Sequence, residues 1–218
     1  QINDEHGQID ALLNLALIAD ARKRYIDSDA KFDKCLEIYQ KLDDKIGIAD
    51  VYTNRTDIEL VRGNYTKARE YVSIALEIFD DLKDNLGRNL NIKEKEKWST
   101  ALNNSANLYR YSKQFESGIS ELLSALSICE SASDQKGASD LYNNLGIIHM
   151  EFGQELYKEG ESKASKIHIT ESQNYFTRHL RCVSEMEEAP ADWFIKNGLF
   201  EDSKHWVEFP PDTSPEWL

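Results

Sequence analysis

The sequence predicts an all-α chain built from about four stacked pairs of antiparallel helices, and three observations lead to this prediction. All four prolines lie at or after Pro190, so no proline interrupts a helix before that point. Apolar side chains recur at spacings of three and four residues, which places them on one face of a helix. The same pattern of small and bulky residues returns along the chain. Such a repeat indicates that each helix pair buries its apolar face against the next pair.

Three segments show the repeat directly. Residues 35–39, 75–79 and 125–129 align with one another, at offsets of 40 and 50 residues. Equivalent aromatic and small residues continue the register: Tyr25, Tyr65 and Phe115; Ala16, Thr56 and Ala106; Ser28, Ala68 and Gly118. Small side chains at fixed points allow two helices to approach closely, while larger apolar residues fill the space around them.

A fourth copy begins near Gly146, which takes the small position of its first helix. About fourteen extra residues enter this copy near 157–170. Its second helix then continues with Ser172 and with His179, which is larger than the residue expected in a tightly packed position. The alternating charges of residues 93–97 lie in a shorter insertion before the third copy and predict a solvated extension of its first helix.

This register resembles the tetratricopeptide (TPR) family, whose signature combines small residues in both helices with Gly-x-Tyr or Gly-x-Phe in the turn. The matching residues are Thr56, Gly63, Tyr65, Ala68 and Ala75 in one copy, and Ala106, Phe115, Gly118 and Ala125 in the next. The resemblance covers about residues 8–187 and implies a right-handed TPR-like superhelix, an α-solenoid. The usual TPR repeat has 34 residues, and the longer repeat here is similar to those of kinesin light chains and of the Rap/PlcR type of bacterial peptide sensors. HEAT-like repeats are the structural alternative.

The first helix of each pair carries an asparagine two residues before its small position. The four asparagines are Asn14, Asn54, Asn104 and Asn144. Asparagine is unfavourable inside a helix, so its recurrence needs a reason. Its amide both donates and accepts hydrogen bonds, as binding to the backbone of an extended peptide requires, and the resemblance implies this use in a concave groove. The alternative is that each asparagine bonds the neighbouring helix.

Other polar residues neighbour this row in the expected groove. The additional candidates are Asn103, Asn143, Asn107 and Arg110. Arg110 and Asn107 could together bind a carboxylate, because guanidinium and amide groups both donate to it. Five aspartates are also expected there: Asp10, Asp20, Asp50, Asp57 and Asp140. An acidic groove favours a basic or polar ligand, and the alternative is that these residues are solvated faces of an acidic protein.

Charge and cysteine content exclude several classes of protein. The net charge of −13 and the lack of a basic patch argue against a nucleic-acid partner. No apolar run is long enough to predict a membrane span. The three cysteines Cys35, Cys129 and Cys182 form no CxxC pair, so we expect a reducing, cytoplasmic compartment. The first residue, Gln1, leaves open an upstream segment that was removed.

The sequence predicts no catalytic residue, metal site or cofactor. Its five histidines form no HExxH pair. His179 and Cys182 are spaced to share a helix face, but two ligands do not close a zinc site. No glycine-rich phosphate loop or nucleophile elbow is present. We therefore expect that the protein is not an enzyme.

The C-terminal segment has a different composition from the repeats. Residues 188–218 contain three of the four tryptophans, and we predict a capping helix followed by an extended tail. The predicted domains are thus a repeat domain over 1–187 and this segment. The predicted function is a scaffold that binds a peptide or protein segment in its concave groove. The alternative is a ligand-responsive module that regulates a partner or an effector domain.

Overall fold

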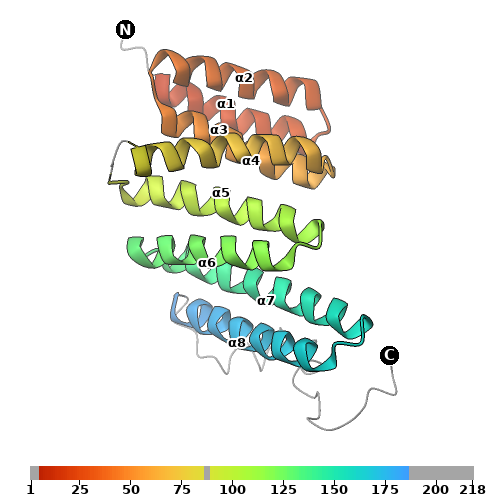
Figure 1. Cartoon of the computed structure of the whole chain (residues 1–218). Coiled ribbons are helices and arrows are strands. Elements are labelled where there is room, and N and C mark those ends of the chain that lie inside the picture. The colour runs from red at the N-terminus through yellow and green to blue at the C-terminus, as the bar shows by residue number, and fades with distance from the viewer. Residues whose placement is uncertain (1–4, 86–88, 187–218) are drawn as a thin grey trace. The chain divides into compact units, whose positions relative to one another are not determined.

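The computed structural model describes residues 5–85 and 89–186, and the chain divides into two compact units, unit 1 (Gln1–Ser133) and unit 2 (Asp134–Leu218). The helices described in unit 1 are α1 (Glu5–Ala21), α2 (Tyr25–Lys41), α3 (Lys45–Arg62), α4 (Tyr65–Asp80), the π-helical turn η1 (Asp81–Asn85), α5 (Ile92–Tyr111) and α6 (Phe115–Ala132). Those described in unit 2 are α7 (Gln135–Lys158) and α8 (Ser162–Met186). No strand occurs within the described ranges, so the prediction of an all-α chain is confirmed for them (Figure 1).

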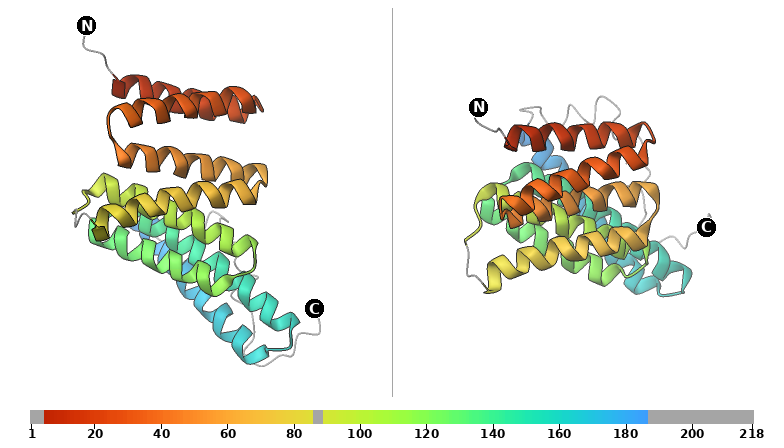
Figure 2. Two further views of the ribbon diagram at one scale, coloured as in Figure 1. Left: turned by 45° about the horizontal axis from the view of Figure 1, so that its top comes forward. Right: turned by 90° about the horizontal axis from the view of Figure 1, so that it is seen from above.

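Each helix packs most extensively against its partner in a pair. The four pairs are α1–α2, α3–α4, α5–α6 and α7–α8, as the sequence predicts. Within unit 1, α2 also packs on α3, α4 packs on α5, and α3 packs directly on α5. Figure 2 shows α1 to α4 as successive layers of this unit. Because α3 contacts α5 while α4 and α6 have no comparable contact, the odd-numbered helices converge there and the even-numbered helices splay apart.

The small positions of the repeat lie where the helices touch. The six residues that define these positions in the first three copies are all buried: Ala16, Thr56, Ala106, Ser28, Ala68 and Gly118. Bulky side chains fill the space around them, such as Phe32 in one cluster and Phe79 in the next. The repeat in the sequence is therefore a repeat of close helix contacts, as the packing argument requires.

The turn inside each helix pair of unit 1 passes through a residue with a left-handed backbone. These residues are Lys23, Gly63 and Lys113, with φ of 59°, 77° and 57°. Gly63 adopts this conformation without a side-chain clash, which explains the glycine of the turn motif in that copy. The next helix pair begins with a capped N-terminus, since the side chain of Asp44 accepts a hydrogen bond from the amide of Gly47 at 2.8 Å.

Unit 2 shows how the fourth copy accommodates its extra residues. Helices α7 and α8 have 24 and 25 residues, against 18 and 16 for α3 and α4. Residues 157–170 form the end of α7, the turn and the beginning of α8. The hydroxyl group of Ser172 donates to the carbonyl oxygen of Gly146, and that of Ser165 donates to the carbonyl oxygen of Gly153. The extra length therefore adds further close contacts of the same kind to both helices.

His179 fits its packed position because a small residue lies opposite it. Its Nδ1 atom is 3.0 Å from the hydroxyl oxygen of Ser139 and 2.9 Å from the carbonyl oxygen of the same residue. In the second copy, the equivalent contact is made by Ala49 and Ala75, which are both fully buried. The imidazole of His179 thus fills this space and forms a hydrogen bond there. In the second copy, the methyl groups of Ala49 and Ala75 fill it.

Two further predictions concern the C-terminal segment and membrane-spanning helices. The predicted cap and tail over 188–218 lie outside the described residues. No helix within the described ranges has an apolar stretch long enough to cross a bilayer.

The close approach at Gly47 gives a direct test of this packing. A Cβ atom added to Gly47 would overlap the ring of Tyr39, and Tyr39 is itself buried. We expect Gly47→Ala to lower the free energy of unfolding by about 1–3 kcal/mol, measured by urea denaturation. The same change in a Tyr39→Leu chain should cost much less. A Gly47→Ala chain as stable as the wild type would contradict the contact.

Candidate functional site

The predicted asparagine row begins on the solvent-facing sides of α1 and α3. Asn14 is exposed and makes no hydrogen bond with the residues that the structure describes. Asn54 is half-buried, and its Nδ2 atom donates to the carbonyl oxygen of Asp50 at 2.9 Å. This bond leaves one N–H and the side-chain oxygen of Asn54 for a ligand. We call the surface that carries Asn14, Asn54 and Asn107 the odd-helix face.

Asn104, the third member of the row, occupies a different environment. It lies between α3 and α5 and is only 5% exposed. Its Nδ2 atom donates to the carbonyl oxygen of Thr53 at 3.3 Å. Asn104 therefore bonds the neighbouring helix, which is the second of the two roles that the sequence left open for the row. Within unit 1, the amides of the row that reach the surface are those of Asn14 and Asn54.

The other predicted site residues lie on α5 and α7. All of them are half-buried: Asn103, Asn107 and Arg110 on α5, and Asn143 and Asn144 on α7. Asn144 is the fourth member of the asparagine row. The guanidinium of Arg110 lies 4.6 Å from the ring centroid of Tyr111. Tyr111 in turn stacks on Tyr65 at 5.0 Å. These ring contacts hold the guanidinium of Arg110 at the C-terminal end of α5. Arg110 lies three residues from Asn107, on the same helix face.

Two of the predicted aspartates are neutralised by cations inside unit 1. A carboxylate oxygen of Asp20 lies 2.6 Å from Arg62, and one of Asp50 lies 2.6 Å from Lys97. Asp57 differs, because the residue is exposed to solvent and yet burial of its carboxyl group raises its pKa. The carboxyl group of Asp57 can attract a cation to the odd-helix face.

Arg62 forms a buried cluster that the sequence analysis did not identify. Its guanidinium pairs with Asp20 and, at 2.6 Å, with Glu59, and it lies 4.5 Å from the ring centroid of Tyr25. Asn64 donates a further hydrogen bond to Glu59 at 2.6 Å. The cluster joins α1, α2 and α3, and the single cation of Arg62 is shared by more than one carboxylate. Asp20 and Arg62 are 42 positions apart, so no local spacing in the sequence indicates the pair.

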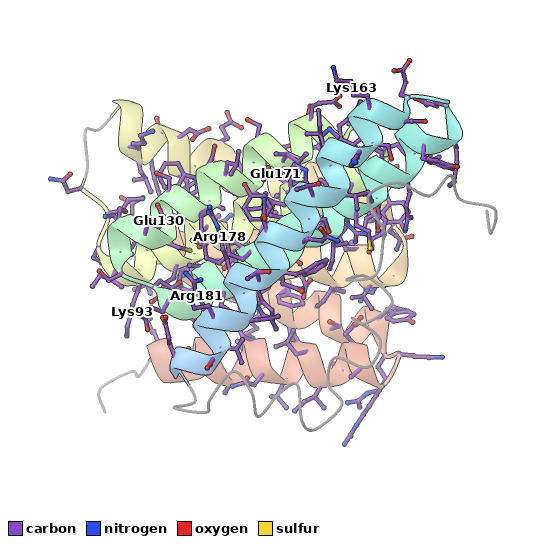
Figure 3. The ribbon with its side chains drawn as sticks, turned by 90° about the horizontal axis from the view of Figure 1, so that it is seen from below. Lys93, Glu130, Lys163, Glu171, Arg178 and Arg181 are labelled. Atoms are coloured by element: carbon purple, nitrogen blue, oxygen red, sulfur yellow. The ribbon has the colours of Figure 1, made fainter. Side chains whose placement is uncertain are left out.

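Unit 2 contains a pair of histidines in direct contact. The Nδ1 atoms of His149 and His168 are 2.9 Å apart, and their ring centroids are 5.1 Å apart. Burial and, to a smaller extent, the proximity of His168 lower the pKa of His149 to about 4, while Glu171 opposes the shift. Glu171 lies on α8 (Figure 3). His149 is therefore neutral at pH 7, and its Nδ1 atom lies within hydrogen-bonding distance of the imidazole of His168.

The cysteines have the properties of buried, unreactive thiols. Cys35 and Cys129 are free and buried. Burial raises the pKa of Cys35 to about 11, whereas a reactive cysteine needs a lowered pKa. Within the described ranges, no three His, Cys, Asp or Glu side chains form a group that could hold a metal ion.

Comparison with known proteins bears on the fold. No protein-family model matches the chain, and no curated protein matches its sequence. The crystal structure of BtubC (BKLC) from P. vanneervenii is similar, with a TM-score of 0.60 and 15% sequence identity over 94% of this chain and 84% of that chain. The structure of pilF from Pseudomonas aeruginosa aligns with a TM-score of 0.40 and 18% identity over 94% of this chain and 97% of that chain. At 15% identity, the similarity to BtubC supports the fold of stacked helix pairs alone.

The histidine pair makes the stability of the fold depend on pH. The unfolded chain takes up a proton near the ordinary histidine pKa of 6.5, whereas folded His149 does so only near pH 4. The contribution of His149 to the free energy of unfolding is therefore fully present above about pH 6.5. It should fall by about 3 kcal/mol as the pH decreases towards 4. Urea denaturation across this range measures the loss.

His149→Gln separates this contribution from that of the carboxylates, which also titrate in acid. The variant has no imidazole at this position, so its stability should fall less steeply between pH 6.5 and 4.5. If wild type and variant lose stability in parallel, His149 is not the group responsible.

Proposed function

We propose that this chain is a TPR-type interaction scaffold that binds a peptide or protein segment along the odd-helix face. The observation that carries the proposal is the pair of amides on successive odd-numbered helices. Asn14 has all its hydrogen-bonding groups unused within the described residues, and Asn54 has one N–H and its oxygen unused. An extended peptide presents alternating N–H and C=O groups, which such amides can bind in both directions.

The dimensions of unit 1 suit a short extended ligand. Packed helices lie about 8–10 Å apart. Because α3 packs on α5 while α1 is joined to α3 through α2, the path from α1 across α3 to α5 is at least about 20 Å long. An extended chain rises about 3.3 Å per residue, so a ligand of at least about six residues is needed to span this path. Asp57 at its middle favours a positively charged side chain in the ligand, and the cation of Arg110 favours a carboxylate near α5.

The proposal involves no catalytic step and no cofactor. It places the protein in the cytoplasm, because Cys35 and Cys129 are free thiols, as a reducing compartment maintains them. HEAT-like repeats share the repeat length of about 40 residues, so it is the Gly63 turn that supports the TPR type over them.

The test begins with peptides selected from a random 12-residue library against the full chain. Asn14→Ala combined with Asn54→Ala removes two amides, each contributing about 0.5–1.5 kcal/mol, so affinity should fall about tenfold or more by calorimetry. The matched control is Asn174→Ala, which removes an exposed asparagine from α8 and should leave affinity unchanged. Circular dichroism checks that helicity is unaltered.

Asn104→Ala separates binding from structure. Because Asn104 is buried and bonds Thr53, this variant should lose about 1 kcal/mol of stability while its folded fraction keeps full affinity. Selected peptides that bind the Asn14/Asn54 double variant as tightly as the wild type would show that the odd-helix face is not the binding site.

A further inference from the structure

The first helix of unit 1, α1, exposes a stripe of apolar side chains. Leu15 and Ile18 are 48% and 46% exposed, and Ala11 is exposed as well. The spacings of four and three residues place all three on one side of the helix. Arg22 continues this stripe by one turn, because its backbone amide donates to the carbonyl oxygen of Ile18 at 3.2 Å. We call Ala11, Leu15, Ile18 and Arg22 the end face.

In the later copies of the repeat, the equivalent positions are buried. With the offsets of 40 and then 50 residues, the counterparts of Ala11 are Val51 and Ala101, and those of Ile18 are Ile58 and Leu108. None of these four counterparts is more than 7% exposed. The end face therefore exposes apolar side chains at positions that the next two copies bury.

The second helix of the preceding pair covers these positions in the later copies. Val51 and Ile58 of α3 lie in one cluster with Phe32 of α2. Leu108 of α5 lies in another cluster with Ala68 of α4. The end face of α1 thus has the pattern by which this protein packs against a helix, and no helix in the described ranges covers it.

The end face also lacks the polar character of a capping surface. The outermost repeat of a helical stack needs a polar outer side if nothing covers it. Of the four residues of the end face, only Arg22 is polar. Neighbouring apolar side chains at a protein surface mark a site of interaction. The end face is therefore a candidate docking surface for a helix.

The charges of α1 indicate which helix fits. Glu5 and Asp10 lie in the first half of α1, whereas Arg22, Lys23 and Arg24 follow its C-terminal end. If a second α1 packs antiparallel on the first, the basic end of each helix lies near the acidic half of the other. A parallel arrangement would place like charges together instead. The end face is thus complementary to a second copy of itself in the antiparallel orientation.

Helix α8 of another copy would suit the end face less well. Ile167 is the only large apolar residue that α8 exposes within the described ranges. Its exposed charged side chains are mainly basic, among them Lys163 and Arg181 (Figure 3). These cations would repel the basic end of α1. A contact of α8 with α1 of the next copy is therefore disfavoured.

We propose that the end face binds a second copy of this chain, with the two α1 helices antiparallel across a two-fold axis near Leu15. In this arrangement, Ile18 of each copy lies against Ala11 of the other. Such a contact closes on itself, so association ends at two chains. The end face borders the odd-helix face at Asn14, but the proposal does not rest on peptide binding, and its test contains no peptide.

Analytical ultracentrifugation of the full chain over a series of concentrations measures the association. A contact along one helix is small for a protein interface, so we expect a dissociation constant on the order of 10–100 µM. Ile18→Glu should raise this constant about tenfold or more, because each dimer loses two buried isoleucines. Circular dichroism checks that the variant keeps its helicity.

Two further variants make the result specific. Ile167→Glu is the matched control, since Ile167 is 57% exposed on α8, and it should leave the dissociation constant unchanged. Leu15→Cys tests the position of the two-fold axis, because it brings the two new thiols together. On mild oxidation, this variant should form a disulfide-linked dimer faster than the wild-type chain, whose own cysteines serve as the control.

Four outcomes would overturn the proposal. The first is a wild-type chain that stays monomeric at every concentration, and the second is an unchanged dimer in Ile18→Glu. The third is Leu15→Cys that cross-links no faster than the wild type. The fourth is growth beyond two chains that Ile167→Glu prevents, which would identify α8 of the next copy as the occupant of the end face.

Discussion

The fold depends on the close approach of helices at a few small residues. Ala49, Ala75 and Ala101 come from three successive helices of unit 1 and are fully buried in one cluster. Around such points, larger side chains such as Phe79 fill the remaining space. A change of one methyl group is felt at contacts of this kind, because the interior is packed as densely as a crystal. The periodic small residues therefore set the spacing of the helices, and the surfaces follow from that spacing.

The two sides of unit 1 differ because consecutive helices alternate between them. On one side, α3 packs directly on α5, which buries the amide of Asn104 and leaves that of Asn54 at the surface. On the other side, α4 and α6 are separated by a groove with Trp98 in its lining. An amide surface suits the backbone of a ligand, whereas a groove with apolar side chains in its lining suits apolar groups. One set of helix contacts thus provides two surfaces of different chemistry.

The helix pairs and their small positions were predictable from the sequence, because both follow from local periodicity and from the repeat. For Asn104 the sequence left two roles open, peptide binding and a bond to the neighbouring helix. Its bond to Thr53 could not be predicted with certainty, because it depends on how far each helix lies from the next. Asn54 holds the same repeat position and bonds its own helix instead. The ion pair of Arg62 with Asp20 could not be predicted, because it joins residues that are 42 positions apart in the sequence. The groove between α4 and α6 could not be predicted either, because its lining residues come from three different helices.

The central claim is that each helix pair is stabilised mainly by its immediate neighbours. Native-state hydrogen exchange of the full chain, in dilute solution where it is monomeric, tests it most directly, because it reports the opening free energy of each helix separately. In unit 1, α3 to α5 have neighbours on both sides, whereas the described contacts of α1 are chiefly with α2. The account predicts the slowest exchange in α3 to α5 and faster exchange in α1. Equal protection of α1 and α3 at the level of global unfolding would contradict it.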